Sequence, residues 1–286
     1  MHQALLVGLP SSGKTTFLAA LWHVIFVRDV DGALELEVLH APFDHLNDLT
    51  GRWLRFEVAN RTSIDAEQTA TIRIKPGDGE STTEIVVPDL AGESIKRSLA
   101  DRQWPTGFRD YVHDSTGVLL FVHPKETSEP WPILDAMEIA GEEALPSQES
   151  GAADASTESE WSAEQVPTDV QLVDLLQLLC TEIATGHFRL AVIVSAWDLV
   201  EEQGTPSEWL AKELPLVDQF LRSHDHSRFD VRVYGVSAQG GELPQESDRL
   251  KSLLSASERI RVVRDANAES HDITEPLRWV VDVDTG

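Results

Sequence analysis

Several short runs of the chain are apolar at every position, as expected for central strands of a parallel sheet covered on both faces. These runs occupy residues 4–7, 117–122, 190–194 and 231–236. Residues 33–39 alternate apolar and acidic side chains, which is typical of a half-exposed strand. Residues 69–75 and 83–87 flank a Pro-Gly-Asp-Gly loop and predict a hairpin. The type of the short apolar stretch 260–263 stays open.

Apolar positions at helical spacing separate these runs. Helices are predicted at residues 15–27, 42–56, 170–185, 207–221 (interrupted at Pro215) and 276–281. The first helix is apolar nearly all round, so we expect it to be buried on several sides. Strands that alternate with helices predict an α/β fold, in which a mostly parallel sheet has helices on both faces in a three-layer sandwich.

One stretch interrupts this pattern, at about residues 124–168. It is acidic and rich in Ser, Ala and Pro, and its central part, residues 147–160, has almost nothing to bury. We expect a solvated, partly disordered insertion within a single domain that spans residues 1–286. The segment could be a functional acidic region that binds a basic partner. A tolerated surface insertion is the simpler interpretation and is preferred.

The charge balance narrows the choice of partners. The chain has 49 acidic and 23 basic residues, for a formal net charge of −26, and such a surface repels nucleic acid and anionic membranes. The one cysteine, Cys180, lies in an apolar stretch, so a reduced core thiol is expected rather than a nucleophile. No secretory signal is evident, and the longest apolar segment, residues 17–27, is too short to span a bilayer. We expect a cytoplasmic protein.

The first strand leads directly into a phosphate-binding motif. Residues 8–15 read Gly-Leu-Pro-Ser-Ser-Gly-Lys-Thr and match G-x-x-x-x-G-K-[ST] without a mismatch. In such a loop, backbone N–H groups and a helix N-terminus face the phosphates, Lys14 adds a charge, and the Thr15 hydroxyl reaches Mg²⁺. The residues predicted to bind the nucleotide here are Gly8, Ser11, Ser12, Gly13, Lys14, Thr15 and Thr16. A Gly/Ser turn that binds nothing is disfavoured, because both the motif and its flanks are complete.

Later strands end in further candidate residues, where ligands of open α/β sheets bind. Asp89 follows the strand 83–87 and forms D-x-x-G with Gly92; we expect Asp89 to hold a Mg²⁺-bound water and the Gly92 N–H to reach the γ-phosphate. Asp198 follows the strand 190–194, and its carboxylate can accept hydrogen bonds from the two donors on guanine. A loop acid or helix cap is an equal alternative for Asp198.

Two other positions complete the candidate site. The small residues Ser237 and Ala238 end the strand 231–236, where a backbone N–H can meet a purine carbonyl, although a plain loop is the simpler interpretation. A threonine that ligates Mg²⁺ and senses the γ-phosphate is also required. Thr62 and Thr69 are both placed for this role, and Thr62 is preferred because it lies in a polar loop ahead of a strand.

These motifs, in this order from Gly8 to about Gln239, resemble the translation-factor and Ras-like class of P-loop GTPases. In that comparison Gly13, Lys14 and Thr15 match the phosphate and Mg²⁺ motif, Asp89 and Gly92 match D-x-x-G, Asp198 matches the acid of N-K-x-D, and Ser237 and Ala238 match S-A-[KL]. Four phrases are similar to the prokaryotic double-GTPase families of biological-conflict systems: GLPSSGKTTFLAALWH, VPDLAGE, TDVQLVDLLQLL and HDITEPLRWV.

The resemblance implies a P-loop NTPase fold that binds GTP or GDP with Mg²⁺. It also implies a switch or trigger that acts with protein partners, such as a companion GTPase or an effector. Lys14, Gly92 and Glu93 are then the residues closest to the chemistry. The segment 93–107, with Trp104, Pro105 and several arginines, is expected to form a partner surface.

The chain departs from the resembled pattern in two places. Ser195 and Ala196 stand where N-K-x-D has Asn and Lys, which weakens guanine selection, although Trp197 could partly replace the lysine stem. Glu93 stands where many Ras-like proteins have a glutamine that orients water. A carboxylate there repels the γ-phosphate, so we expect slow hydrolysis, or help from a partner's arginine finger worth about 10³–10⁵ in rate.

These departures keep two alternatives open. An ATP- or mixed-nucleotide P-loop ATPase or kinase would fit the missing Asn-Lys pair. A nucleotide-bound scaffold that does not hydrolyse would fit Glu93 and the acidic insertion.

Overall fold

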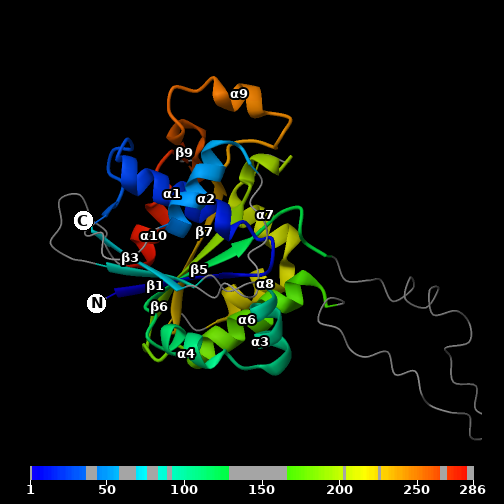
Figure 1. Cartoon of the computed structure of the whole chain (residues 1–286). Coiled ribbons are helices and arrows are strands. Elements are labelled where there is room, and N and C mark those ends of the chain that lie inside the picture. Colours follow the sequence, from blue (N-terminus) through cyan, green and yellow to red (C-terminus); the bar gives the residue numbers. More distant parts are fainter. Residues whose placement is uncertain are drawn as a thin grey trace, which may run out of the picture.

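A mixed sheet forms the centre of the molecule. The computed structural model describes residues 2–36, 44–57, 69–75, 83–88, 92–128, 166–201, 204–224, 227–264 and 269–281. Within these residues the sheet has nine strands in the order β2-β3-β4-β1-β5-β6-β7-β8-β9 (Figure 1). The strands are β1 His2–Gly8, β2 Glu35–Leu36, β3 Thr69–Lys75, β4 Thr83–Pro88, β5 Gly117–Val122, β6 Phe188–Ser195, β7 Phe229–Ser237, β8 Arg261–Val263 and β9 Glu269–Ser270.

The middle of this sheet is parallel and its two edges are antiparallel. Strands β4, β1, β5, β6 and β7 pair in parallel, which confirms the mostly parallel sheet read from the apolar runs. Every residue of β5 is buried, as a strand covered on both faces requires. The predicted hairpin is confirmed by the antiparallel pairing of β3 with β4. The stretch whose type was open is β8, which pairs antiparallel with β7 and β9.

Helices pack on both faces of the sheet (Figure 1). One face carries α1 Lys14–Val27, α2 Asp44–Leu54 and α10 Glu275–Val280. The other carries α3 Gly92–Asp101, α4 Thr106–His113, α6 Thr168–Glu182, α7 Pro206–Glu213 and α8 Pro215–Ser223. The remaining elements are the short helix α9 Ser247–Lys251 and the 3₁₀ turns η3 Trp197–Leu199 and η4 Ser257–Arg259. The predicted three-layer α/β fold is therefore confirmed.

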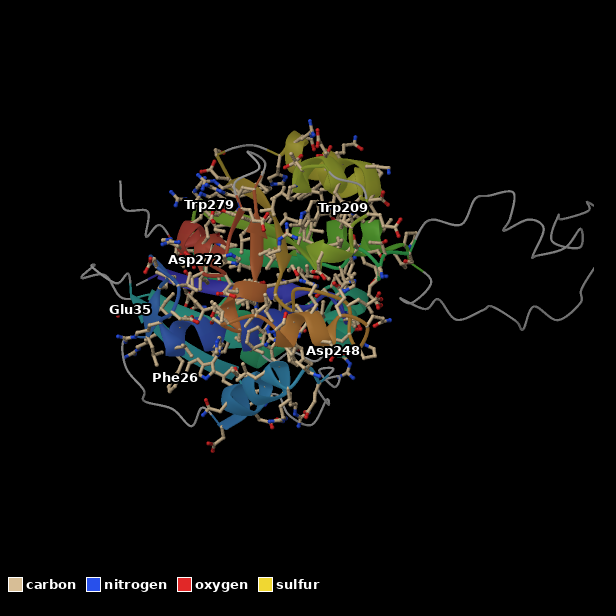
Figure 2. The ribbon with its side chains drawn as sticks, turned by 90° about the horizontal axis from the view of Figure 1, so that it is seen from above. Phe26, Glu35, Trp209, Asp248, Asp272 and Trp279 are labelled. Atoms are coloured by element: carbon tan, nitrogen blue, oxygen red, sulfur yellow. The ribbon has the colours of Figure 1, made fainter. Side chains whose placement is uncertain are left out.

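Helix α1 shows why an all-round apolar helix lies inside the molecule. All nine residues from Phe17 to Ile25 are buried, between the sheet and α2. The last turn reaches the surface, where Phe26 is 59% exposed, and Figure 2 shows it at the periphery. Burial on several sides was expected and is confirmed. The helix that begins at the phosphate-binding motif is consequently a rigid part of the core.

Helix α6 begins two residues earlier than the sequence indicated. It starts at Thr168 rather than at residue 170. Asp169 is buried, and its carboxylate accepts hydrogen bonds of 2.9 Å from the backbone N–H groups of Leu216 and Val217 at the start of α8. An acidic composition hid this residue, because a helix cap and a solvated acid look alike in sequence. Helix α6 also ends at Glu182 rather than at residue 185.

The two ends of the insertion lie side by side. The backbone N–H of Ser128 donates to Thr168 Oγ1 over 2.8 Å, and the Thr168 N–H donates to Ser128 Oγ over 3.1 Å. Residues 129–165 are outside the described part of the chain, so the expectation that they are partly disordered stays a prediction.

One residue of the segment 93–107 contradicts the partner surface predicted for that segment. The segment forms most of α3 and leads into α4. Trp104 is 6% exposed and packs edge-on against Phe108, with ring centroids 5.1 Å apart. Together with Ile95 and Val112 it belongs to the core on this face of the sheet. Trp104 is therefore a core residue, and its assignment to a partner surface was wrong.

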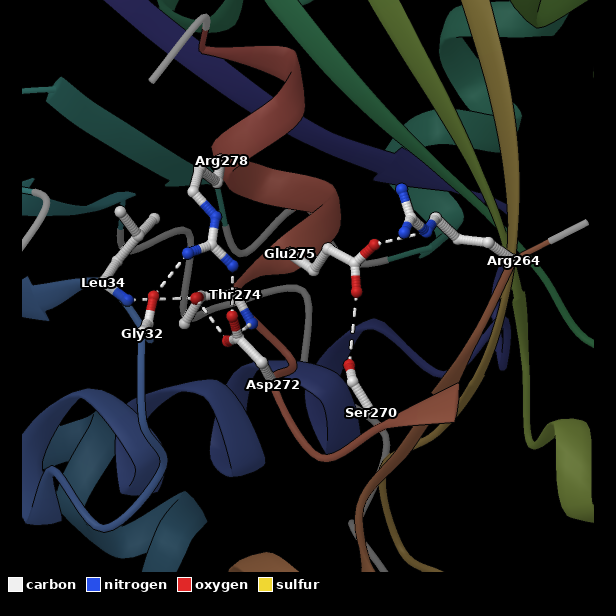
Figure 3. A network of polar contacts seen from close by, with 8 residues as sticks. All are labelled: Gly32, Leu34, Arg264, Ser270, Asp272, Thr274, Glu275 and Arg278. Carbon is white, nitrogen blue, oxygen red and sulfur yellow. Dashed lines mark hydrogen bonds and ion pairs between the residues drawn. The ribbon is translucent and has the colours of Figure 1, made fainter. Parts of the chain in front are cut away.

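A polar network ties α10 to the chain that follows α1 (Figure 3). The hydroxyl of Thr274 accepts a hydrogen bond of 3.0 Å from the Leu34 N–H, and Arg278 donates to the carbonyl of Gly32. Asp272 accepts from the N–H of Thr274 over 2.9 Å and pairs with Arg278. The HDITEPLRWV phrase thus anchors the start of β2 to the C-terminal helix. Among the described helices, none is long and apolar enough to cross a membrane.

Candidate functional site

The carboxyl ends of the parallel strands meet at one edge of the sheet. The register pairs Gly8 with Phe121, Val122 with Val194, and Ser195 with Val236. Because β4 and β5 lie on opposite sides of β1, the strand order changes direction at β1. Ligands of open α/β sheets bind at such a switch point. The phosphate-binding motif begins there.

The loop between β1 and α1 is closed around the ammonium group of Lys14. Lys14 Nζ donates to the carbonyl oxygens of Gly8 and Leu9 over 2.7 and 2.8 Å, and to Ser12 Oγ over 3.0 Å. Ser11 has a left-handed backbone with φ of 58°. Thr15 and Thr16 are half-buried in the first turn of α1. The loop therefore gathers its cation and its helix N-terminus at one place, as a phosphate site requires.

Gly13 is required by the geometry of this loop. It caps α1 with φ of 91°, and a Cβ there would stand 2.7 Å from Cβ and Oγ of Ser195. The Ser195 hydroxyl donates to the carbonyl oxygens of Ser12 over 2.8 Å and of Val122 over 3.1 Å. Ser195, in the place of the asparagine of N-K-x-D, thus ties the end of β6 to the phosphate loop.

The predicted base-binding residues lie together at the ends of β6 and β7. Asp198, in η3, accepts a hydrogen bond from the hydroxyl of Ser237. The same hydroxyl accepts one from the N–H of Gly240 over 3.0 Å. Ser237 is buried, whereas Asp198 is half-buried. This pair orients an acceptor carboxylate beside the small-residue loop that includes Ala238.

The Trp197 side chain is not available to replace the lysine stem of N-K-x-D. A Cβ on Gly235 would lie 2.5 Å from the Trp197 indole, so the ring packs directly on the backbone of β7. It also contacts the core on the α6 and α8 side of the sheet. The indole is consequently used for packing.

A shallow hollow opens beside the phosphate loop. Its lining residues come from α1, from α2 and the residue Glu57 beyond it, and from the loop after β7: Thr15, Thr16, Ala19, Leu49, Arg52, Trp53, Glu57 and Gln239. The sequence pattern missed Arg52, Trp53 and Gln239. Of these three residues, only Gln239 could have been identified from the sequence, because it directly follows Ser237 and Ala238. The hollow places the phosphate-binding helix and the predicted base loop around one space.

Two predicted magnesium ligands, Thr62 and Asp89, lie outside the described residues. Of Glu93 the structure describes the backbone, in the first turn of α3 after Gly92. Thr69 does begin β3, where it pairs with Pro88 directly before Asp89. No cluster of three or more His, Cys, Asp or Glu suited to a metal occurs in the described ranges. A P-loop metal site does not need one, since one hydroxyl and the phosphates supply most ligands.

Comparison with known families agrees with this arrangement. The family model of Double-GTPase 1 matches residues 5–280. The chain belongs to the Double-GTPase 1 family. The resemblance to P-loop GTPases of the double-GTPase type is therefore confirmed, and this member is a GTP-binding P-loop protein. No curated protein matches the sequence.

Three solved structures are distantly similar to this Double-GTPase 1 chain. The signal recognition particle receptor SRb-GTP/SRX complex from Chaetomium thermophilum is 13% identical over 87% of this chain and 95% of that one, with a TM-score of 0.41. The S. cerevisiae Ski7 GTPase-like domain, bound to GDP and inorganic phosphate, is 12% identical over 83% and 43%, with a TM-score of 0.41. Roco2 RocCORdC of Methanosarcina barkeri, bound to GDP, is 11% identical over 87% and 47%, with a TM-score of 0.35.

Proposed function

We propose that the protein is a Mg²⁺-dependent GTPase switch that acts with partner proteins, as a trigger in a prokaryotic conflict system. The observation that carries the proposal is the position of Asp198 and Ser237 at the sheet edge that also holds the Lys14 loop. Phosphate binding and base recognition then act on the two ends of one nucleotide. The family membership supports guanine as the base.

The nucleotide would be held mainly by groups that are already oriented. Lys14 exchanges its bonds to the carbonyls of Gly8 and Leu9 for the β- and γ-phosphates, while the loop N–H groups and the α1 N-terminus face the same oxygens. Asp198 accepts from the N1–H and amine of guanine, a donor pair that adenine lacks. The bond from Ser237 holds the Asp198 carboxylate in place for this contact.

One described residue supports a magnesium site. Thr15 supplies a half-buried hydroxyl in the first turn of α1, beside the hollow. We assign Thr15 and Asp89 to this ion, with Thr62 as the switch ligand and Thr69 as its alternative. When bound, Mg²⁺ would offset the negative charge of the phosphates.

Slow turnover is part of the proposal. Hydrolysis needs a water in line with the γ-phosphate and stabilisation of the charge that develops on it. The Gly92 N–H can report the γ-phosphate to α3, but Glu93 adds a negative charge in the same turn. A group from a partner would therefore set the rate, which suits a trigger better than a metabolic enzyme.

Base choice can be tested by titration with fluorescent GDP and ADP analogues. The parent is expected to prefer GDP, Lys14→Ala to lose both nucleotides, and Asp198→Ala to lose the preference. Asp198→Asn is a more specific test of base recognition than Asp198→Ala. Its amide can donate to the C2 carbonyl of xanthine, so it should shift the preference to xanthosine diphosphate. Equal or tighter ADP binding that Asp198→Ala leaves unchanged would favour the ATP- or mixed-nucleotide alternative.

Turnover is tested separately, by phosphate release from GTP under multiple-turnover conditions. Slow release that depends on Mg²⁺ and is lost in Asp89→Ala is the expected result. A protein that binds GTP but releases no phosphate, alone or with its partners, would instead be the non-hydrolysing scaffold.

A further inference from the structure

Arg259 is an arginine buried without an acidic partner. Arg259 is 3% exposed, and no carboxylate among the described residues acts on its guanidinium. Its guanidinium carbon lies 3.7 Å from the ring centroid of Trp53 and 4.6 Å from that of Phe56. Nη2 donates to the carbonyl oxygen of Trp53 over 3.1 Å, and Nε has no hydrogen-bond partner in the described part of the chain. Burial lowers the pKa of Arg259 to about 10.

An arginine in this setting is a costly way to fill space. A buried cation loses its hydration, and two aromatic faces and one carbonyl replace it only in part. A methionine or leucine would fill the same volume without that cost. What arginine adds is a flat, charged surface that fixes the plane and position of the aromatic rings it contacts.

Trp53 connects this cation to the predicted base loop. Its indole N–H donates to the carbonyl oxygen of Ala238 over 3.0 Å, in a buried position. Ala238 follows Ser237, whose hydroxyl holds Asp198. The indole therefore joins the end of α2 to the loop after β7. Arg259 packs over that indole.

The same tryptophan forms a wall of the hollow beside the phosphate loop. Thr16 and Gln239 line the hollow together with Trp53. The Gln239 side-chain amide nitrogen is buried there and has no hydrogen-bond partner within the described ranges. Movement of the indole would thus change both the hollow and the carbonyl bond that holds the base loop.

We propose that Arg259 is a positioning residue of the nucleotide site: by stacking on Trp53 it holds α2 against the base loop and so sharpens guanine recognition. This inference rests on the proposed guanine site. It assigns Arg259 no contact with the nucleotide. Its effect reaches the base through Trp53 and Ala238.

The test compares affinities for GDP and ADP in Arg259→Lys, which keeps the charge but removes the flat stacking surface. ADP affinity depends on the phosphate contacts and is expected to stay near that of the parent. GDP affinity is expected to fall about tenfold, because a lysine ammonium keeps the charge but cannot stack on the indole as the planar guanidinium does. A purely structural role would weaken both nucleotides alike, so the GDP/ADP ratio is the deciding measurement.

Two further variants keep the test decisive. Trp53→Phe retains an aromatic face for Arg259 but removes the indole N–H, and it should lower the GDP/ADP ratio even if Arg259→Lys does not fold. Arg222→Lys is the matched control, because Arg222 is exposed on α8 and pairs with Asp218. Parental ratios in Arg259→Lys and Trp53→Phe would overturn the inference. A parent without a GDP preference would instead refute the guanine site itself.

Discussion

The hydroxyl of Ser195 donates a 2.8 Å hydrogen bond to the carbonyl oxygen of Ser12 and so joins the end of β6 to the phosphate loop. It also donates to the Val122 carbonyl over 3.1 Å. Ser195→Ala would leave both buried carbonyls without this donor and should cost about 1–2 kcal/mol of unfolding free energy. Urea unfolding measures this loss.

The exposed Ser223 offers a matched control for Ser195. Its hydroxyl donates to the Phe220 carbonyl over 3.2 Å in an exposed position, so Ser223→Ala should leave the unfolding midpoint almost unchanged. GDP affinity should fall only in Ser195→Ala, because only that serine holds the phosphate loop. Equal midpoints and equal affinities for the two variants would show that the Ser195 bond does not stabilise the loop.

Asp169 joins α6 to α8, and its removal is expected to be more damaging. Its carboxylate accepts from the N–H groups of Leu216 and Val217. Asp169→Ala leaves two donors without acceptors and should cost about 2–3 kcal/mol, since bonds to a charged group are the stronger kind. Asp169→Asn, which keeps one acceptor oxygen, should lie between this variant and the parent.

The control for Asp169 is Asp248→Ala on α9. The Asp248 side chain is fully exposed, and Figure 2 shows it at the surface. Its replacement should change the unfolding free energy by less than about 0.5 kcal/mol. If Asp169→Ala were no less stable than Asp248→Ala in urea, the capping role assigned to Asp169 would be wrong.

Local sequence patterns predicted the centre of the fold and the phosphate loop. Strands such as β5 are apolar at each position because both faces are covered, and this signal needs no knowledge of distant residues. The loop from Gly8 to Thr15 is likewise one contiguous motif. In contrast, α3 and α4 are short, and their polar residues concealed the apolar positions Ile95 and Val112 that reach the core.

The wall of the hollow could not be predicted, because distant residues build it. Arg259 and Trp53 are 206 residues apart in sequence, and Trp53 and Ala238 are 185 apart. Trp53 is one apolar position of the predicted helix 42–56, and Arg259 stands directly before the apolar stretch 260–263, whose type the sequence left open. Neither has a local pattern that indicates its partner. Only the folded chain brings them together.

The single cysteine gives a direct test of packing around α6. Burial raises the pKa of the Cys180 thiol to about 11, with Arg228 acting weakly in the opposite direction. Against an ordinary value of 9.0, near pH 8 this leaves about 100-fold less thiolate, the reactive form, than in the unfolded chain. Iodoacetamide should therefore label the native protein at least that much more slowly than the urea-unfolded protein. Cys180 is half-buried against the core, and equal rates would mean that this packing does not shield the thiol.

Because His23 is buried, we expect the unfolding free energy to fall in mild acid. Burial lowers its pKa, with Asp29 opposing and Arg259 adding to the shift, so the folded state keeps the ring neutral below pH 6.5. The unfolded chain binds a proton from about pH 6.5 downward, so unfolding takes up a proton and the unfolding free energy falls as the pH drops. The fall should continue until the folded-state pKa is reached.

The measurement is the urea midpoint between pH 7.5 and 5.5 for the parent and for His23→Gln. The variant should show a shallower decline, because its side chain does not titrate. His123, whose pKa burial also lowers, contributes the same sign in both proteins, so the difference between the two slopes isolates His23. Parallel slopes would show that His23 is protonated equally well in the folded state.

Ser128 and Thr168 are hydrogen-bonded to each other, and we call this pair the neck of the acidic segment. We expect that the segment between them can be removed. Hydrogen bonds of 2.8 and 3.1 Å join these residues, so a short Gly-Ser linker can replace residues 129–165 without moving either end. Because loop-closure entropy changes slowly with length, the unfolding free energy should shift by only about 1 kcal/mol. GDP affinity should also stay at the parental value, since the described lining of the hollow comes from elsewhere.

A control variant removes one of the hydrogen bonds of the neck. Thr168→Val removes the hydroxyl that accepts from the Ser128 N–H and should destabilise the full-length chain and the shortened chain by the same amount. Equal effects would place the stabilising contact in the neck itself. A shortened protein that loses its cooperative transition or its GDP binding would contradict the prediction, because residues 129–165 would then belong to the core or to the site.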